Sequence, residues 1–424
     1  MANYIAKSIR LTTGTITTAL ILTHGIARAD AVLDWNTVMQ STVASQPPFP
    51  QARFAAITQV AVFEAVNAIK KDYKPYLGTI TALADASVEA AAVAAAHTVL
   101  KAYFPGNSAT LDAARVNSLA MIPDGPAKTS GIAAGEMAAV AVMAARNDDG
   151  SAPSAFYLPA SSKPGEWQPT PSCTAVGGAF YQWRNVKPFV LRNADQFRLD
   201  EPPALSSARY ARDYSEVKSV GNTNSAIRPQ DRSDVARFYA VTSPVAVWNP
   251  VARQLGVTAG NSVAANARAL ALLNMALNDA AVATFDTKYH YRFWRPETAI
   301  HLGQSDDNQA TDADPSFTPL VTTPCFPSYP SAHATLSNAA REVLEKLYGS
   351  RRRSLILSSS AAPDITLRYN KLKEITADID DARVYGGIHF RFDQEAGADL
   401  GRLVGDYVFK NSLGSIRACG CEDR

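Results

Sequence analysis

Helical periodicity runs through most of the chain and is the feature that most limits its fold. Between residues 53 and 70, Phe54, Ile57, Ala61 and Ala65 follow one another at three- or four-residue intervals, which places them on one face of a helix. Alternating patterns of the kind that strands show are few and short. The sequence therefore predicts an all-α protein made of packed helical bundles. Further helices are expected over residues 87–102, 130–146, 263–285, 331–347 and 394–408.

A stretch rich in proline and aromatic residues, over residues 151–204, interrupts the helical pattern. Proline lacks a backbone donor and fixes φ, so a long regular helix is excluded there. Aromatic residues such as Trp167 and Trp183 argue against a free linker. We expect an ordered crossover between two helical halves.

The length and apolar content suit such a division. At 424 residues, 47% of them apolar, the chain can bury a large core. We predict an N-terminal half over residues 30–204, which includes the crossover, and a C-terminal half over residues 205–424. Each half should resemble a four-helix bundle, with the functional site in the C-terminal half.

The first 29 residues have the pattern of a secretory signal peptide. Lys7 and Arg10 precede an apolar stretch at residues 19–22, and Ala27 and Ala29 offer small side chains for cleavage. The apolar run is too short to span a membrane comfortably, and no later segment approaches twenty uninterrupted apolar residues. We therefore expect an exported product, periplasmic or secreted, that begins near Asp30 and keeps no stable membrane span.

Cysteine content and net charge limit which cellular compartment and which kinds of partner the sequence suits. Cys173, Cys325, Cys419 and Cys421 would meet an oxidising compartment after export, and four cysteines allow three complete pairings. Lys and Arg number 41 against 39 Asp and Glu, a formal charge of +2. This balance lacks the basic excess of a nucleic-acid-binding protein, so no nucleic-acid partner is expected.

Unusual polar chemistry gathers in three segments of the second half. The first contains Lys288 and Arg295, near the end of the long apolar helix expected from residue 263. A compact ammonium and a planar guanidinium could together neutralise and orient a tetrahedral oxyanion. Basic residues near a helix C-terminus also complement the helix dipole, so this segment alone is a weak signal.

The second segment surrounds the start of the helix expected over residues 331–347. Ser331 stands at its N-cap, where free backbone N–H groups and the positive end of the helix dipole favour an anion. His333 follows in the first turn and is well placed for proton transfer. The alternative is an ordinary capped helix with a partly exposed histidine.

The third segment contains Arg383, His389 and Asp393. His389 and Asp393 are four residues apart and would share a face if the segment is helical, so that the carboxylate holds one imidazole nitrogen. The other nitrogen would then face a ligand. Arg383 offers a second guanidinium, and Gly386 and Gly387 permit close approach of backbone or ligand.

Taken together and in this order, the patterns K-x6-R-P, P-S-x-H and R-x5-H-x3-D resemble the superfamily shared by vanadium haloperoxidases and type 2 phosphatidic acid phosphatases. The stretches FWRP at 293–296, FPSYPSAHAT at 326–335 and HFRFD at 389–393 are especially similar to vanadium chloroperoxidases. One position departs from the family, which usually has glycine where this chain has Ala332. Alanine keeps the backbone N–H that the family uses, although its methyl group narrows the adjacent space.

The resemblance implies a vanadate cofactor and a haloperoxidase reaction. His389 would coordinate vanadium, oriented by Asp393, and His333 would accept a proton from hydrogen peroxide. Halide would then be oxidised to hypohalous acid, which reaches a small organic acceptor. The vanadate oxygens would be held by Lys288, Arg295, Arg383, Ser331 and the N–H of Ala332.

The resemblance also indicates the halide region. Phe285 and Phe326 occupy positions where aromatic residues line that region in chloroperoxidase-like relatives, although both could equally be core residues. We expect oxidation of chloride or bromide ahead of activity restricted to iodide.

Two alternatives remain open. Phosphate and vanadate are both tetrahedral oxyanions, so the chain could be an exported acid phosphatase, which needs no metal cofactor. In that enzyme His389 attacks phosphorus to give a phosphohistidine, and His333 protonates the leaving alcohol. The second alternative is a non-enzymatic, oxyanion-binding helical protein. A pure binding site has no evident need for both histidines, which argues against that alternative.

Overall fold

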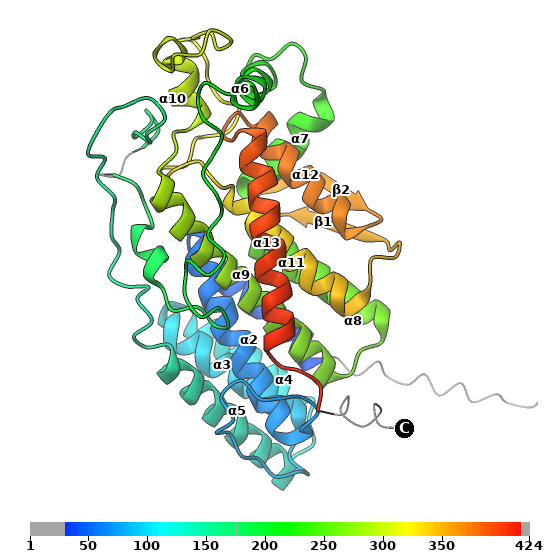
Figure 1. Cartoon of the computed structure of the whole chain (residues 1–424). Helices are drawn as coiled ribbons and strands as arrows, with labels where there is room; N and C mark the ends of the chain where they lie inside the picture. Colours follow the sequence, from blue (N-terminus) through cyan, green and yellow to red (C-terminus); the bar gives the residue numbers. More distant parts are fainter. Residues whose placement is uncertain (1–29, 174–176, 417–424) are drawn as a thin grey trace, which may run out of the picture.

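The computed structural model describes residues 30–173 and 177–416. Helices dominate it, which confirms the predicted all-α class (Figure 1). In the described part the α-helices are α1 (Ala31–Val43), α2 (Pro48–Lys70), α3 (Val88–Tyr103), α4 (Ser108–Ala120), α5 (Pro126–Ala145), α6 (Ala208–Gly221), α7 (Gln230–Val241), α8 (Pro244–Ala259), α9 (Val263–Tyr291), α10 (Pro296–His301), α11 (Ala332–Tyr348), α12 (Leu372–Tyr385) and α13 (Arg391–Asn411).

Most helix boundaries follow local signals in the sequence. Ser331 caps α11 as predicted, with its side chain accepting from the backbone N–H of Ala334. The helix expected from residue 263 runs on past residue 285 and ends where Arg292 adopts a left-handed φ of 53°. The helix expected from residue 53 begins earlier, with Pro48 in its first turn, where a missing donor costs nothing.

The long helix α9 lies at the centre of the molecule and packs against α2, α8, α11 and α13 (Figure 1). One buried apolar cluster includes residues of helices on both sides of the crossover. α9 therefore connects the packing of early and late helices, and its last turn carries Lys288 into the interior. The division of the chain into two halves stays a prediction.

Helices α11 and α13 pack closely because glycine lines their contact. A Cβ atom on Gly397 would lie 2.7 Å from the carbonyl oxygen of Ser331, and one on Gly401 would lie 2.3 Å from that of Thr335. Real Cβ atoms do not approach carbonyl oxygens this closely, so larger residues would push the helices apart. This contact fixes the beginning of α13 against the beginning of α11.

A small antiparallel hairpin is the exception to the helical architecture. Strand β1 (Leu355–Ser359) pairs with β2 (Ala362–Tyr369), with Leu355 opposite Tyr369. Leu355, Leu357 and Ala362 are buried in the core, and β1 packs against α8. The hairpin lies at one side of the helical body (Figure 1).

The crossover at residues 151–204 is ordered where the structure describes it. Apart from a short 3₁₀ helix, η2 (Tyr181–Asn185), its described residues form neither helix nor strand, as the prolines predict. Trp167 and Trp183 are buried. Asp279 of α9 anchors the segment, because its carboxylate accepts the backbone N–H groups of residues 189–191 at 2.6, 2.7 and 3.0 Å.

Of the three possible cysteine pairings, the structure contains the one that joins Cys173 to Cys325, with Cα atoms 5.4 Å apart. The bond ties the crossover to the loop that precedes α11. Cys419 and Cys421 lie outside the described residues, as does the predicted signal peptide at residues 1–29.

One described helix, α2, is long and apolar enough to cross a membrane by length and composition alone. Of its most apolar window, 89% is buried inside the molecule, as in the core helix of a folded domain.

Candidate oxyanion site

Three cations from different parts of the chain are buried at one place. Lys288 lies in the last turn of α9, Arg295 directly precedes α10, and Arg383 lies in the last turn of α12. Their exposed fractions are 0%, 0% and 4%. Asp393 is the carboxylate whose charge acts on both Lys288 and Arg295. The balance is positive, and a buried positive balance favours an anionic ligand.

Backbone carbonyls hold Lys288 in place. Its Nζ donates to the carbonyl oxygens of Pro327 and Ser328, at 2.8 and 2.7 Å. An ammonium has three N–H donors, so one remains for a ligand. The loop that leads into α11 thus fixes the charge that the sequence places on α9.

Arg295 is fixed through two sides of its guanidinium. Its Nε donates to the carbonyl of Phe326 at 2.8 Å, and its Nη1 donates to the carbonyl of Ile388 at 2.9 Å. The same Nη1 lies 3.0 Å from Nε2 of His389. Its Nη2 is buried and has no hydrogen-bond partner among the described residues.

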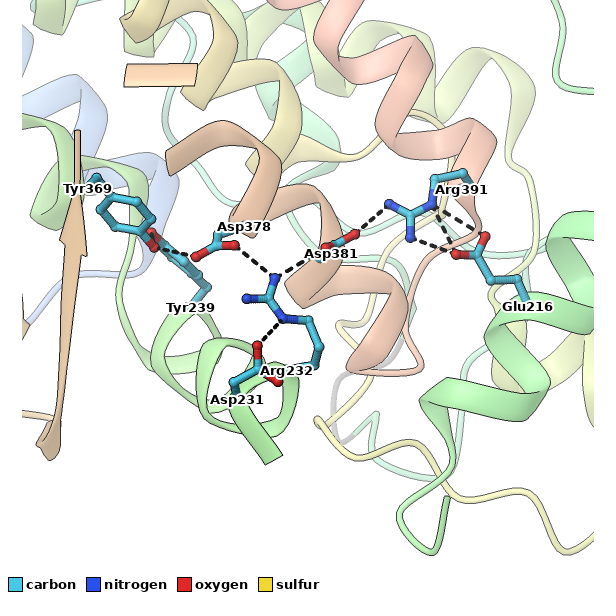
Figure 2. A network of polar contacts seen from close by, with 8 residues as sticks. All are labelled: Glu216, Asp231, Arg232, Tyr239, Tyr369, Asp378, Asp381 and Arg391. Carbon is cyan, nitrogen blue, oxygen red and sulfur yellow. Dashed lines mark hydrogen bonds and ion pairs between the residues drawn. The ribbon is translucent and has the colours of Figure 1, made fainter. Parts of the chain in front are cut away.

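Arg383 is held from α7, where the carbonyl of Tyr239 accepts from its Nη1 at 3.1 Å. Its Nε is buried without a partner among the described residues. Figure 2 shows how Tyr239 is itself fixed: its hydroxyl lies 2.9 Å from that of Tyr369, which donates to Asp378 at 2.8 Å.

The same polar network continues to the start of α13 (Figure 2). Arg232 of α7 pairs with both Asp378 and Asp381 of α12, at 2.8 and 3.2 Å. Asp381 also pairs with Arg391 at 2.9 Å, and Arg391 pairs with Glu216 of α6 at 2.7 Å. These contacts brace α7, α12 and α13 against one another. α12 carries Arg383, and α13 begins just after His389.

His389 and Asp393 meet as predicted, but not on one helix. α13 begins at Arg391, so His389 lies just before it. The two side chains still reach each other, with Nδ1 of His389 2.8 Å from Oδ2 of Asp393. They do so because Asp393, in the first turn, reaches back and accepts from the backbone N–H of Phe390 at 3.1 Å.

Ser328 is part of this arrangement and was not anticipated from the sequence. Its hydroxyl donates to Oδ2 of Asp393 at 2.5 Å and lies 3.3 Å from Nδ1 of His389. An ionised carboxylate only accepts hydrogen bonds, so Nδ1 of His389 carries the hydrogen. Nε2 then presents its lone pair toward Arg295. The sequence did offer one signal for Ser328: a second Pro-Ser pair, at residues 327–328, precedes the Pro-Ser of the motif at residues 330–331.

The first turn of α11 completes the arrangement. Ser331 is fully buried, and its backbone N–H donates to the carbonyl of Asp393 at 2.9 Å. Ala332 and His333 follow, and their backbone N–H groups belong to the unsatisfied first turn of a helix. His333 is partly exposed and lines a cavity together with Arg383 and His389.

Burial and mutual repulsion set the protonation of the site. Burial first, and then the charge of Arg295, lowers the pKa of Lys288 well below its usual value, and burial lowers the pKa of both arginines. Burial and the three cations also lower the pKa of His333 and of His389 well below 6.5. Both imidazoles are therefore neutral near pH 7. Burial raises the pKa of Asp393 to about 6, against the hydrogen bond from Ser328, which lowers it.

The donor set fits a tetrahedral oxyanion such as vanadate or phosphate. Arg295 Nη2 and Arg383 Nε are buried donors without a partner among the described residues, and buried donors of this kind call for an acceptor. The free N–H of Lys288, the hydroxyl of Ser331 and the first turn of α11 add further donors. The unprotonated Nε2 of His389 suits a metal or phosphorus centre. In the ranges 30–173 and 177–416, no group of three His, Cys, Asp or Glu side chains could hold a bare metal ion.

An apolar cavity of about 220 Å³ opens onto these groups. We call it the inner cavity; its lining includes Phe49, Phe180, Phe326, His333, Arg383 and His389. The ring of Phe326 lies under Nζ of Lys288, 5.3 Å from its centroid, and under the guanidinium of Arg295 at 5.0 Å.

Of the two aromatic residues predicted for the halide region, the structure places Phe326 in the lining of the inner cavity. Phe285 lies behind it, fully buried, with its ring centroid 5.4 Å from that of Phe326 and 4.5 Å from that of Phe49. Phe49 and Phe180 were missed because α2 and the crossover reach the site only in the folded chain. No local pattern distinguishes them from core aromatics.

Comparisons with known proteins point in one direction. A family model described as the second helical-bundle domain of VCPO matches residues 268–417. The vanadium chloroperoxidase of Curvularia inaequalis is 26% identical over 190 residues, which are 37% of this chain and only 30% of that protein.

Solved structures extend the likeness over most of the chain. A bacterial vanadium-dependent iodoperoxidase has a TM-score of 0.76 and 26% identity, covering 91% of this chain and 96% of its own. The apo form of a bacterial vanadium-dependent chloroperoxidase has a TM-score of 0.72 at 16% identity, covering 88% and 96%, which is a likeness of fold.

Proposed function

Since the chain belongs to the vanadium haloperoxidase superfamily, we propose that it is a vanadium-dependent enzyme that oxidises halide ions with hydrogen peroxide to hypohalous acid. The observation that carries this proposal is the combination of a cationic oxyanion site with a small aromatic cavity. The site supplies donors for vanadate, and the inner cavity, at about 220 Å³, is of a size for peroxide and halide.

The residues that would hold vanadate divide into one metal ligand and a set of donors. Nε2 of His389 would bind vanadium, because Asp393 and Ser328 fix the opposite nitrogen as the donor. Bound there, vanadate supplies a Lewis-acidic centre that activates hydrogen peroxide toward halide. The oxygens would be held by Lys288, Arg295, Arg383, Ser331 and the backbone N–H of Ala332.

His333 would act as the general base. Burial and the cations Arg383, Lys288 and Arg295 lower its pKa, so the imidazole is neutral and can accept a proton from hydrogen peroxide. It lines the inner cavity, which gives peroxide access to it. Among the described residues that line this cavity, no other titratable side chain is both neutral near pH 7 and outside the set proposed to bind the oxyanion.

The aromatic lining supports halide as the second substrate. Phe49, Phe180 and Phe326 keep the inner cavity apolar, which weakens the hydration of an entering halide, while the positive balance of the site attracts the anion. The alcohol part of a phosphomonoester is polar, whereas the rings of Phe49, Phe180 and Phe326 make the space beside the oxyanion site apolar. This apolar lining favours the haloperoxidase over the phosphatase.

The test uses purified protein freed of bound oxyanion. It is assayed with hydrogen peroxide and iodide, bromide or chloride, with and without orthovanadate, and in parallel with a phosphomonoester without vanadate. We expect vanadate-dependent halide oxidation that phosphate suppresses by competition. Phosphomonoester turnover without halide oxidation would assign the chain to the phosphatases instead.

We also propose that the protein is exported. The predicted signal at residues 1–29 motivates this, and the disulfide between Cys173 and Cys325 supports it, because disulfides persist in oxidising compartments. N-terminal sequencing of protein from the periplasm or medium should give a chain that starts near Asp30. Intact protein retained in the cytoplasm would contradict export.

A further inference from the structure

The segment at residues 321–328, which we call the cavity loop, holds much of the oxyanion site together. Four of its residues line the inner cavity: Val321, Thr322, Pro324 and Phe326. Its last three carbonyl oxygens accept hydrogen bonds, one from Nε of Arg295 at 2.8 Å and two from Nζ of Lys288 at 2.8 and 2.7 Å. A change in this loop therefore acts on two of the three buried cations.

The ends of the cavity loop are fixed by backbone hydrogen bonds. The N–H of Val321 donates to the carbonyl of Gly386 at 3.0 Å, and the N–H of Ser328 donates to the carbonyl of Phe293 at 2.8 Å. Between these ends, no backbone N–H of the loop reaches another segment of the described structure. Two of the residues there are prolines, which lack a backbone donor. The middle of the loop therefore depends on other contacts.

The proline-rich crossover holds the middle of the loop. The hydroxyl of Ser172 donates to the carbonyl of Thr323 at 3.1 Å. The backbone N–H of Ala179 donates to the carbonyl of Cys325 at 2.8 Å. The disulfide from Cys325 to Cys173 adds a covalent link at the same place. The crossover thus reaches the loop through one covalent bond and two hydrogen bonds between neutral groups, which are individually weak.

Opening the disulfide would leave the middle of the cavity loop weakly held. Besides the two hydrogen bonds from the crossover, the hydroxyl of Thr323 donates to Glu297 of α10. Cys325 stands between Pro324 and Phe326, both of which line the inner cavity, so movement at the cysteine reaches the cavity directly. Both cysteines of the pair are partly exposed, so a small reductant can reach the bond.

Lys288 and Arg295 make a loosened loop unfavourable for ligand binding. Both side chains are fully buried, and both donate to carbonyl oxygens of the loop. A buried cation without its acceptors is unfavourable, and donors that no longer converge hold an oxyanion less well. Neither Cys173 nor Cys325 belongs to the apolar core clusters of the described residues, so we expect the helices to stay folded without the bond.

We propose that the disulfide between Cys173 and Cys325 positions the cavity loop and thereby completes the oxyanion site, so that the folded dithiol form binds an oxyanion more weakly than the disulfide form. The inference rests on the oxyanion site of the proposed function and does not depend on halide oxidation. For a chain that is exported, as proposed above, the site is completed after the chain has left the reducing cytoplasm.

Closure of the bond is a thiol–disulfide exchange. The thiolate of one cysteine attacks an external disulfide, whose sulfur–sulfur bond breaks and releases one thiol. The thiolate of the other cysteine then displaces the second thiol as the bond between Cys173 and Cys325 forms. The two cysteines are oxidised by two electrons, and the external disulfide is reduced to two thiols.

The test measures phosphate affinity by calorimetry on protein freed of bound oxyanion, before and after reduction with dithiothreitol. Inorganic phosphate is the probe, since a reductant would also attack vanadate. Reduction should weaken phosphate binding at least about 10-fold, the size of effect that the loss of one charged hydrogen bond gives. Reoxidation should restore the affinity. Far-UV circular dichroism should show the same helix content in both forms.

Two double variants separate this disulfide from the other cysteines. Cys173→Ser with Cys325→Ser should bind phosphate as weakly as the reduced parent and should not respond to dithiothreitol. Cys419→Ser with Cys421→Ser is the matched control, because these cysteines lie outside the described residues. It should bind phosphate like the parent and lose affinity on reduction as the parent does.

A measurement on the parent needs no variant. By linkage, phosphate must favour the disulfide form by the same factor by which reduction lowers phosphate affinity. In a dithiothreitol redox buffer, saturating phosphate should therefore move the midpoint of reduction to more reducing potentials, by about 30 mV for each 10-fold in affinity. A role in overall stability alone would not give this shift while the helix content stays constant.

Tight phosphate binding that is equal in both redox states would overturn the proposal, as would loss of the helices on reduction, which would make the bond a staple of the whole fold. Neither result would contradict the proposed halide oxidation, which is assayed separately with vanadate and peroxide. Protein that binds no phosphate in either state would overturn both this inference and the oxyanion site on which it rests.

Discussion

Ser328 donates its hydroxyl hydrogen to Oδ2 of Asp393 over 2.5 Å. The same oxygen holds Nδ1 of His389 at 2.8 Å, so one serine orients the carboxylate that orients the proposed metal ligand. A hydrogen bond to an ionised carboxylate stabilises that form and lowers its pKa. Ser328 thus acts on His389 through Asp393.

Ser328→Ala should raise the pKa of Asp393 above its present value of about 6, because burial then acts without the opposing hydrogen bond. Vanadate affinity should fall roughly 10–100-fold, as for other partners of metal ligands. The loss should be larger at pH 6 than at pH 8, where Asp393 is ionised in both proteins. Equilibrium dialysis at the two pH values measures this loss. Ser337→Ala, which changes a buried serine on α11, is the control. If Ser328→Ala bound vanadate at pH 6 as tightly as the parent, Ser328 would have no role in oxyanion binding.

Arg295→Lys should weaken oxyanion binding although the charge is kept. The guanidinium spans the carbonyls of Phe326 and Ile388 and still presents Nη2, whereas an ammonium cannot span both. One charged hydrogen bond contributes about 1.5–3 kcal/mol, which corresponds to roughly 10–100-fold in affinity. Calorimetry with phosphate and with vanadate checks this against Arg237→Lys at an exposed position. Equal affinity would mean that Arg295 supplies charge alone.

Phosphate should raise the pKa of His333. In the absence of an anion, burial and repulsion from Arg383, Lys288 and Arg295 lower that pKa, and a bound dianion offsets the repulsion. An NMR titration of the histidine ring signals should therefore show the His333 midpoint move to higher pH when phosphate is added. His97 lies in the Asp112 and Arg115 cluster and its midpoint should not move. If the titration midpoint of His333 did not change when phosphate was added, phosphate would bind elsewhere in the molecule.

Ala332→Gly should leave the site functional. Position 332 is the first residue of α11, and both amino acids supply the same backbone N–H. Glycine costs up to about 1 kcal/mol in a helix and less at its end. Vanadate affinity and bromide oxidation should stay within about 3-fold of the parent, the equivalent of less than 1 kcal/mol. Complete inactivation would show that the methyl group of Ala332 has a role of its own.

The sequence was most informative where function depends on local chemistry. Apolar periodicity and the capping residue Ser331 predicted α9 and α11, which carry Lys288 and His333, whereas α12, which carries Arg383, was not among the predicted helices. Lys288, Arg295 and Arg383 were expected in one site because all three belong to motifs of one family. The fold buries all three side chains.

Long-range contacts could not be predicted in the same way. Phe49 and Phe180 reach the inner cavity from α2 and the crossover, and nothing near them in the chain reports that proximity. The choice of Cys173 and Cys325 among three pairings likewise depends on how the crossover folds back. The sequence also could not show that His389 lies just before its helix and not on it. A spacing of four residues fits a pair on one helix, but it equally fits an Asp393 that reaches back past the N-cap.

Vanadate retention in two histidine variants tests the central claim most directly. Folded His389→Ala and His333→Ala proteins are dialysed to equilibrium against orthovanadate, and bromide oxidation is measured on the same samples. His389→Ala should no longer retain vanadate tightly, because Nε2 of His389 forms the proposed bond to vanadium. His333→Ala should retain vanadate within about 3-fold, less than 1 kcal/mol, yet lose roughly 10²–10⁴-fold in turnover, as expected for a general base. If His389→Ala holds vanadate as tightly as the parent while His333→Ala loses it, the proposed roles are contradicted.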